Sequence, residues 1–318
     1  MDAILEYFSS LNPASFLGAL PGNIAQGILW GLMALGVFIT FKLLNFADLT
    51  VDGSFATGGA VTAILLFNGV NIYVAVLAAL AAGIISGLIT GFLHTLLGIP
   101  DILSGILTQI ALYSINLNIM GKSNLPISYR NYTLVVSSSN IMMAIIIGLA
   151  IAAVIIAAMY WYFGTEQGAT IRSTGSNPAM SKAQGININA SKVVALALSN
   201  GLVALSGSLF AQYQGFSDIN MGRGAIVIGL AAVIIGQVLG EVIFRKRINF
   251  VIRLIFVVAG GVLYYIAMGI VLWLKMPTDD TKLFTAVIVA IFLAVPYLQN
   301  KSKTSFKKVA KQNAKNAN

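Results

Sequence analysis

The chain has 318 residues, of which 58% are hydrophobic and 9% are charged, and its formal net charge is +9. So large an apolar fraction exceeds what a soluble core could bury, so the lipid bilayer must be the solvent for most of the chain. The absence of cysteine excludes disulfides and thiolate metal sites, and the single histidine, His94, excludes histidine clusters.

The N-terminal segment, residues 1–22, precedes the first long apolar run. Its first twenty residues contain Asp2 and Glu6 but no basic residue, unlike a secretory leader, so we expect no cleavable signal peptide. We expect this segment to rest as a short helix in the membrane interface or to enter the interface partway.

Hydropathy predicts one all-α integral membrane domain over residues 23–300. A hydrocarbon core about 30 Å thick requires roughly 20 apolar helical residues per crossing. The apolar runs predict nine transmembrane helices, or ten if the N-terminal segment also crosses. The nine predicted spans are 24–44, 54–68, 72–97, 99–120, 140–162, 191–211, 224–243, 250–273 and 282–299.

The stretch "LNFADLTVDGS" (Leu44–Ser54) places Asp48 and Asp52 between two apolar runs. The span that follows it makes only about 22 Å of helix, and the helix expected after residue 223 is similarly short. Non-helical backbone at membrane depth must be buried in protein or line a water-filled cavity. Asp52 can act as the N-cap of the next helix, a role that does not exclude lining a pathway. Asp48 has no such structural role, so we interpret it as functional.

An internal repeat connects this stretch with a second one. A shift of 170 residues aligns Gly31–Gly53 with Gly201–Arg223, with six identities in 23 positions. Each segment holds a helix, a Phe-x-Asp break and a short return helix. Because the two leading helices are expected to cross in opposite directions, we predict inverted four-span repeats at about 24–120 and 191–299, linked by the span 140–162. Transporters build a site between such halves.

Basic residues gather on one side of the predicted membrane. If the tail 301–318 is cytoplasmic, alternation of the spans puts 14 of the 19 lysines and arginines inside. This distribution follows the positive-inside rule and leaves the N-terminus outside. We interpret the tail either as a disordered, solvated charge run or as a contact for anionic lipid.

The longest cytoplasmic loop, residues 163–190, contains its own helix signals. Asn177 followed by Pro178 is an N-cap with proline at the first helical position, and Gly185 is a stop signal. A two-turn helix is too short to be stable alone in water, so it needs a partner. Met180 and Ala183 form an apolar knob suited to a groove on a peripheral protein, and the alternative is a self-packed connector.

Two motifs carry a family resemblance that extends over residues 22–299. The loop sequence "IRSTGSNPAMSKAQGIN" resembles the cytoplasmic coupling segment of permeases of ATP-binding-cassette importers of the branched-chain amino acid, ribose and autoinducer type. The sequence "LNFADLTVDGSFATGGAV" resembles the matching pattern after their first long helix. Within it, "DLTVDGSF" is similar to tryptophan or tyrosine importer permeases.

The resemblance implies a type II importer fold in a bacterial plasma membrane. Two permeases, expected to be two copies of this chain, would enclose one path and bind two cytosolic ATPases and an external substrate-binding protein. The resemblance implies no cofactor in this chain, because ATP and Mg²⁺ are used by the partner ATPase. The implied passenger is an amino acid, with aromatic ones such as tryptophan or tyrosine favoured over branched-chain ones, and a sugar or nucleoside is the remaining alternative.

The resemblance and the pattern together define two sets of candidate residues. The residues expected to contact the ATPase are Arg172, Thr174, Gly175, Asn177, Pro178, Met180, Ala183 and Gly185. The residues expected along the pathway or its gates are Asn45, Phe46, Asp48, Thr50, Asp52, Ser54, Phe216, Ser217, Asp218 and Asn220.

Two other function classes remain open from the sequence. An ion-coupled secondary transporter with Asp48 as ion or proton ligand fits the inverted repeats equally well, although it does not explain the docking loop. An intramembrane serine enzyme would need a base beside Ser54 or Ser208, and we interpret the single histidine, His94, as either a satisfied or an interfacial residue. The "GKS" at 121–123 lacks the earlier glycine of a phosphate-binding loop, so we expect ATP hydrolysis to come from a partner.

Overall fold

The computed structural model describes residues 13–274 except 129, 131 and 245–247, together with scattered positions between 283 and 294. Within this part of the chain, eight helices are long and apolar enough to cross a membrane. The two strands that it contains have three residues each. The fold is therefore an all-α membrane fold, as the sequence predicts.

The elements follow the predicted order along the chain. They are α2 (Pro13–Val37), the π-helix η1 (Phe38–Leu43), α3 (Thr50–Phe67), α4 (Ile72–Thr95), α5 (Asp101–Met120), β1 (Asn124–Pro126), α6 (Ile141–Gly164), α7 (Glu166–Ser176), α8 (Pro178–Ala183), α9 (Ile188–Gln214), β2 (Phe216–Asp218), α10 (Ala225–Phe244) and α11 (Phe250–Trp273).

The first helix begins earlier than predicted. Its apolar span, Ala14–Leu43, has 30 residues, which makes about 45 Å of helix, well beyond a hydrocarbon core of about 30 Å. Residues 13–22 are continuous with it, so the predicted division after residue 22 is not present in the structure. Pro21 lies inside the helix, and membrane helices tolerate such a proline because neighbouring groups satisfy the freed backbone. The interfacial placement predicted for residues 1–12 lies outside the described residues.

The C-terminal predictions also lie largely outside the described residues. This applies to most of the span 282–299 and to the basic tail 301–318. The eight described spans match the first eight predicted spans in order, with ends that differ by a few residues apart from the start of α2.

Helix α9 lies at the centre of the bundle and packs against α2, α3 and α4. Its contact with α2 is antiparallel, because Ser199 Oγ donates to the Gly36 carbonyl (2.8 Å) while Ser206 Oγ donates to the Leu29 carbonyl (2.7 Å). Small residues bring the backbones together: a Cβ at Gly58 would collide with the backbone of Ala204. Close packing of small residues is the usual means of helix association in lipid, because burial of apolar surface contributes little free energy where the solvent is itself apolar.

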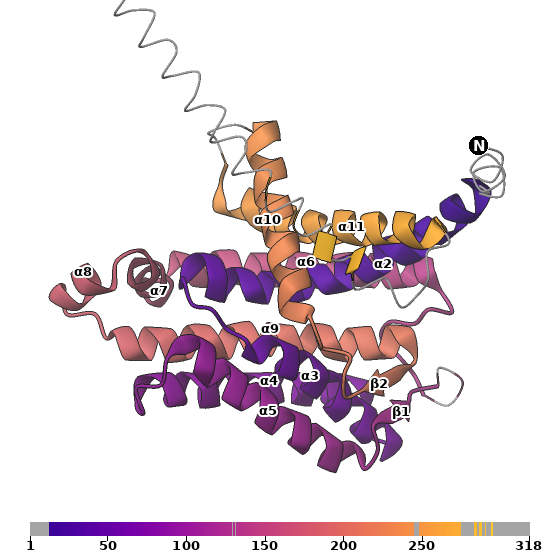
Figure 1. Ribbon diagram of the computed structural model, residues 1–318. Helices are drawn as coiled ribbons and strands as arrows, with labels where there is room; N and C mark the ends of the chain where they lie inside the picture. The colour runs from indigo at the N-terminus through magenta and orange to yellow at the C-terminus, as the bar shows by residue number, and fades with distance from the viewer. Residues whose placement is uncertain are drawn as a thin grey trace, which may run out of the picture.

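The two ends of the bundle carry different structures. In Figure 1, α7 and α8 project at one end, where α2 finishes, and the strands lie at the opposite end. Strands β1 and β2 are antiparallel, with Leu125 opposite Ser217. The pairing joins the end of the first predicted repeat to the break in the second.

The helix order fits inverted repeats. Helices α2 to α5 form the first set, α6 is the link, and α9 to α11 begin the second. The leading helices α2 and α9 run in opposite directions (Figure 1), and each is followed by a break of helix, at 44–49 and 215–224 respectively. Both breaks fall where the aligned Phe-x-Asp motifs predict them.

Candidate functional site

The first break, residues 44–49, begins where the π-helix η1 ends. Asn45 has a positive φ of 55°, in the left-handed region of backbone conformation, and this residue redirects the chain out of the helix. The amide of Phe46 then donates to the carbonyl of Thr40 (2.9 Å), and the Phe46 ring is buried. Single π-turns are frequently found at functional positions of helices. The amides of Leu44 and Phe46 thus find acceptors within the protein where the backbone leaves the helix, in accord with the requirement of the membrane.

Asp48 lies in this break and is almost completely buried, with 1% of its surface exposed. One carboxylate oxygen accepts from the amide of Thr50 (2.9 Å), and the other accepts from Asn200 Nδ2 on α9 (2.7 Å). Asn200 Oδ1 in turn accepts from Ser54 Oγ (2.7 Å). The carboxylate therefore joins the two repeats, and three of the predicted pathway residues belong to this buried network.

Hydroxyl groups extend the network through the first repeat. Thr50 Oγ1 lies 2.7 Å from Thr90 Oγ1 on α4, and Thr90 Oγ1 donates to Thr108 Oγ1 on α5 (2.9 Å). All three threonines are buried. Hydrogen-bonded polar chains of this kind fix the relative positions of helices when every member is satisfied.

Asp52 was predicted as a possible N-cap of the helix that follows it, α3. The prediction of a capping role is right, but the helix that Asp52 caps is a different one. The residue lies in the first turn of α3, and its carboxylate oxygens accept from the amides of Gly224 (2.9 Å) and Ile226 (2.8 Å). These amides open α10, whose unpaired donors and dipole favour an anion. Asp52 of the first repeat thus caps the return helix of the second.

The second break, residues 215–224, repeats the local geometry of the first. Gly215 has a positive φ of 83°, and one oxygen of Asp218 accepts from the amide of Asn220 (2.7 Å). Ser217 is fully buried, whereas Asn220 is exposed and the Phe216 side chain is 38% exposed. The predicted residues of the second break therefore differ in exposure and do not share one environment.

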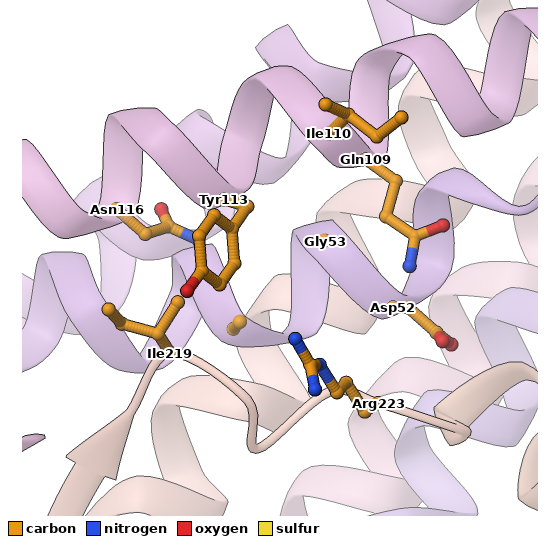
Figure 2. Close-up of a pocket in the computed structure, with 9 residues that line it drawn as sticks. Asp52, Gly53, Gln109, Ile110, Tyr113, Asn116, Ile219 and Arg223 are labelled. Atoms are coloured by element: carbon orange, nitrogen blue, oxygen red, sulfur yellow. The ribbon is translucent and has the colours of Figure 1, made fainter. Parts of the chain in front are cut away.

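A cavity of about 280 Å³ lies between the repeats. It is lined by side chains of α3, α5 and the second break: Asp52, Gly53, Ala56, Gln109, Ile110, Tyr113, Asn116, Ile219 and Arg223. In Figure 2, Asp52 and Gln109 lie toward one end and Tyr113, Asn116 and Ile219 toward the other, with the Arg223 guanidinium between them. The cavity thus has a carboxylate at one end, a cation between the ends and an aromatic, apolar group of side chains at the other end.

Of the predicted pathway residues, only Asp52 lines this cavity. The polar residues of α5 were not predicted, although their spacing in the sequence gave a signal. Gln109, Tyr113 and Asn116 stand at i, i+4 and i+7 of an apolar helix, which puts them on one face. A polar stripe on a membrane helix is expected to face protein or water, not lipid. Arg223 carried no comparable signal.

Helix α7 of the loop contacts the start of the first break directly. The α7 backbone at Gly175 lies so close to Leu43 that a Cβ there would collide with the Leu43 carbonyl. As predicted, Asn177 caps α8, its side chain accepting from the Met180 amide (3.0 Å), and Gly185 has a positive φ of 80°. The α7–α8 unit is thus docked on the membrane domain through Gly175.

The predicted coupling residues differ in exposure. Thr174 is buried, and Gly175 is half-buried against the first break. The remaining members are exposed, and they are Arg172, Asn177, Pro178, Met180, Ala183 and Gly185. The Met180 side chain is 58% exposed, which is high for an apolar residue on a short helix.

His94 is held by two partners of its own. The Lys192 ammonium donates to Nε2 (2.8 Å), so Nδ1 carries the proton and donates to the Ile99 carbonyl (2.8 Å). The ring also makes an edge contact with Phe46, at 5.1 Å between centroids. In the part of the chain that the structure describes, no cluster of three or more metal-ligating His, Cys, Asp or Glu side chains is found.

Helices that break between apolar spans, related as inverted repeats and enclosing a cavity lined in part by charged and polar side chains, are features of the membrane-spanning subunit of a transporter. Residues 22–296 match the family described as "Branched-chain amino acid transport system / permease component". The chain belongs to this family.

Individual relatives agree with this assignment. The chain is 39% identical over 294 residues, 92% of its own length and 96% of the relative's, to the "Tyrosine transport system permease protein" of Clostridioides difficile. It is 25% identical to a "Ribose import permease protein" of Escherichia coli, covering 73% of this chain and 74% of the relative. A chain in the structure of PsaBC from Streptococcus pneumoniae in complex with Fab has the same fold, with a TM-score of 0.52 at 14% identity over 92% of this chain and 94% of that one.

Proposed function

We propose that this chain forms the translocation pathway of an ATP-driven amino acid importer and that its passenger is an aromatic amino acid such as tyrosine. The observation that carries the proposal is the cavity between the repeats, which offers both a carboxylate, Asp52, and a cation, Arg223, beside apolar and aromatic side chains. The name of the Clostridioides difficile relative, a tyrosine transport permease, supports the same passenger.

A zwitterionic amino acid carries a carboxylate and an ammonium group, and each requires a partner of opposite charge. Its carboxylate is attracted to a guanidinium, which can donate two parallel hydrogen bonds, and its ammonium is attracted to a carboxylate. Arg223 is exposed at the cavity, whereas Asp52 already accepts from two amides of α10. Asp52 therefore contributes mainly its negative charge. Gln109 is the additional hydrogen-bonding group at the same end of the cavity.

The α7–α8 end is the cytoplasmic side in this proposal. Lys42, Arg172, Lys182 and Lys192 lie on or next to the elements of that end, in accord with the positive-inside rule. The strands and the cavity then lie toward the outside, where an external binding protein would deliver substrate. The protein would lie in a bacterial plasma membrane with its C-terminal tail in the cytoplasm. A second copy of this chain would complete the translocation path.

The exposed loop helix is the element that an ATPase would contact. An apolar helix face that enters a groove of a partner is a common mode of docking, and Met180 supplies such an apolar side chain. Movement of α7 would reach the break directly, because Gly175 lies against Leu43. From there the Asp48–Asn200 hydrogen bond leads to α9 of the other repeat. ATP and Mg²⁺ would be bound by the partner ATPase, with no catalytic group in this chain.

The proposal is tested by uptake into liposomes that contain this chain, its ATPase and its binding protein. Arg223→Gln should lower tyrosine uptake by about tenfold or more, because a hydrogen bond to a charged group contributes about 1.5–3 kcal/mol. Lys122→Gln is the matched control, since Lys122 is an exposed basic residue near the end of α5 that does not line the cavity. Equal uptake by both variants and the wild type would contradict the proposed site.

The ion-coupled alternative makes the opposite prediction. It requires uptake that follows an ion gradient without ATPase and is lost in Asp48→Asn. The geometry does not favour it, because both oxygens of Asp48 already accept hydrogen bonds within the protein. A serine enzyme is not favoured either, since Ser54 bonds to Asn200 and Ser208 to Thr62, and His94 lies with Lys192.

A further inference from the structure

Asn116 is an unusual side chain for its position on α5. It is 1% exposed, yet neither its amide nitrogen nor its amide oxygen has a hydrogen-bond partner. A buried amide without partners costs about 1–3 kcal/mol in a folded protein. Buried polar groups in native structures are generally paired, so an exception of this kind calls for a partner outside the chain.

The position of Asn116 points to that partner. The residue lines the cavity between the repeats, at the end that also holds Tyr113 and Ile219 (Figure 2). Tyr113 precedes it by three residues, so the two side chains are neighbours on one helix face. The 43% exposed Tyr113 side chain stands at the cavity while Asn116 lies buried beside it.

The Asp52–Gln109 end of the cavity and Asn116 are separated by two turns of α5. Gln109 lies close to α3, because a Cβ at Gly53 would contact the Gln109 backbone, and Asp52 is the neighbour of Gly53. The seven residues from Gln109 to Asn116 span about 10 Å along the helix. An amino acid with its ammonium at the Asp52 end and its carboxylate at Arg223 would therefore reach Asn116 only with an extended side chain such as a para-substituted ring.

We propose that Asn116 binds the side-chain hydroxyl of a phenolic amino acid and makes the cavity select tyrosine over phenylalanine. The inference rests on the proposed function, and it names the group that this end of the cavity recognises. A phenol hydroxyl both donates and accepts one hydrogen bond, and the carboxamide of Asn116 offers one acceptor and donors to match. Ile110 and Ile219 supply apolar surface for the ring between the two ends.

Selectivity for tyrosine over phenylalanine follows because the Asn116 amide has no hydrogen-bond partner within the protein. A site built to bond a substrate hydroxyl discriminates against the analogue that lacks it, because the buried polar group is then left without a partner. Phenylalanine would enter the same apolar space but leave the Asn116 amide without a hydrogen-bond partner. One neutral hydrogen bond corresponds to about a tenfold difference in affinity.

The test measures equilibrium binding of tritiated tyrosine and tritiated phenylalanine to the assembled permease–ATPase complex in nanodiscs, without any binding protein. The variants are Asn116→Leu and the matched control Asn118→Leu. Asn118 is on the same helix, but it is exposed and its Nδ2 donates to the Ser114 carbonyl (3.0 Å). Melting temperatures of the ligand-free complexes are recorded for all three proteins.

The expected result is that the wild type and Asn118→Leu bind tyrosine about tenfold more tightly than phenylalanine, whereas Asn116→Leu binds both with similar affinity. Asn116→Leu should also melt at a higher temperature without ligand, because an unpaired buried amide has been replaced by an apolar group of similar size. A preference for tyrosine that survives in Asn116→Leu would overturn the inference and leave the proposed function intact. Failure of the wild type to bind either amino acid would overturn both.

Discussion

The two helix breaks share a backbone pattern and differ in what surrounds it. Positions 45 and 215, which are 170 residues apart, both have positive φ, and positions 48 and 218 are both aspartates that accept from the amide two residues later. Yet Asp48 is buried and bonded to Asn200 of the other repeat, whereas Asp218 is half-buried and its further contact, Asn124 Nδ2, is at 3.5 Å. The same local motif therefore serves as an inter-repeat contact in one copy and as a turn in the other.

A second difference lies four residues further on. The aligned residues are Asp52 in the first repeat and Gly222 in the second, and they meet: a Cβ at Gly222 would collide with the Asp52 carbonyl. Asp52 caps α10 with both carboxylate oxygens. One copy supplies an acid and the other supplies the space that lets it approach, which shows how an inverted repeat becomes asymmetric at its contact.

The largest effect is expected where the loop meets the first break. Gly175→Val places a branched side chain against the Leu43 carbonyl, so α7 must move away from the break. We expect the stimulation of ATPase activity by loaded binding protein to fall about tenfold or more in liposomes, the usual size of a coupling between sites. Gly164→Val, at the end of α6 where a Cβ meets nothing within 4 Å, should retain the stimulation. Retention in Gly175→Val as well would show that the loop does not act through this break.

The next effect compares the two motif aspartates. Asp48→Ala leaves Asn200 Nδ2 without its carboxylate partner and should lower the free energy of unfolding by about 2–4 kcal/mol. Asp218→Ala, at a half-buried turn, should lower it by less than about 1 kcal/mol. Thermal unfolding of both variants in the same detergent gives the comparison. Similar losses at the two sites would mean that the Asn200 contact adds little.

A smaller effect is expected at the cap between repeats. Asp52→Ala removes both acceptors from the start of α10 and should cost about 1–2 kcal/mol of stability. Asp52→Asn keeps one acceptor and should cost about half as much. Hydrogen exchange at the amides of Gly224 and Ile226 measures the effect locally. Unchanged protection of these amides in Asp52→Ala would contradict the capping role.

The smallest effects are expected at the two left-handed residues. Gly215→Ala introduces strain at φ 83° and should cost about 1 kcal/mol. Asn45→Gly relieves the smaller strain at φ 55° and should change stability by only a few tenths of a kcal/mol. Melting temperatures of the two single variants and the double variant would reveal opposite signs. A loss of stability in Asn45→Gly would indicate that the Asn45 side chain has a role of its own.

Much of the fold could be predicted because each prediction depended on local chemistry. Hydropathy placed eight described spans, and the Asn177–Pro178 pair predicted the start of α8. The first span was predicted to begin at residue 24, but α2 begins earlier and runs through Pro21 and Gly22. In lipid the cost of leaving a helix is larger, so the helix continues.

The candidate site was predictable only in part. The sequence pointed to Asp48 and Asp52 as acids inside a membrane, but their partners Asn200 and Gly224 lie more than 150 residues away along the chain. The polar face of α5 could have been predicted from the helical spacing of Gln109, Tyr113 and Asn116 in the sequence. That Asn116 lacks a partner could not be seen in the sequence, since the absence depends on every neighbouring helix.

The sequence by itself determined the membrane environment, the order of the spans, the two helix breaks and the capped loop helix, because burial in lipid, backbone satisfaction and capping depend on neighbouring residues. The tertiary structure decided which helix Asp52 caps, that Asp48 joins the repeats and where the cavity lies. These features arise from contacts between segments distant in the chain. A carboxylate has the same chemistry at either break, and only the packed helices around it decide whether it holds the repeats together or closes a turn.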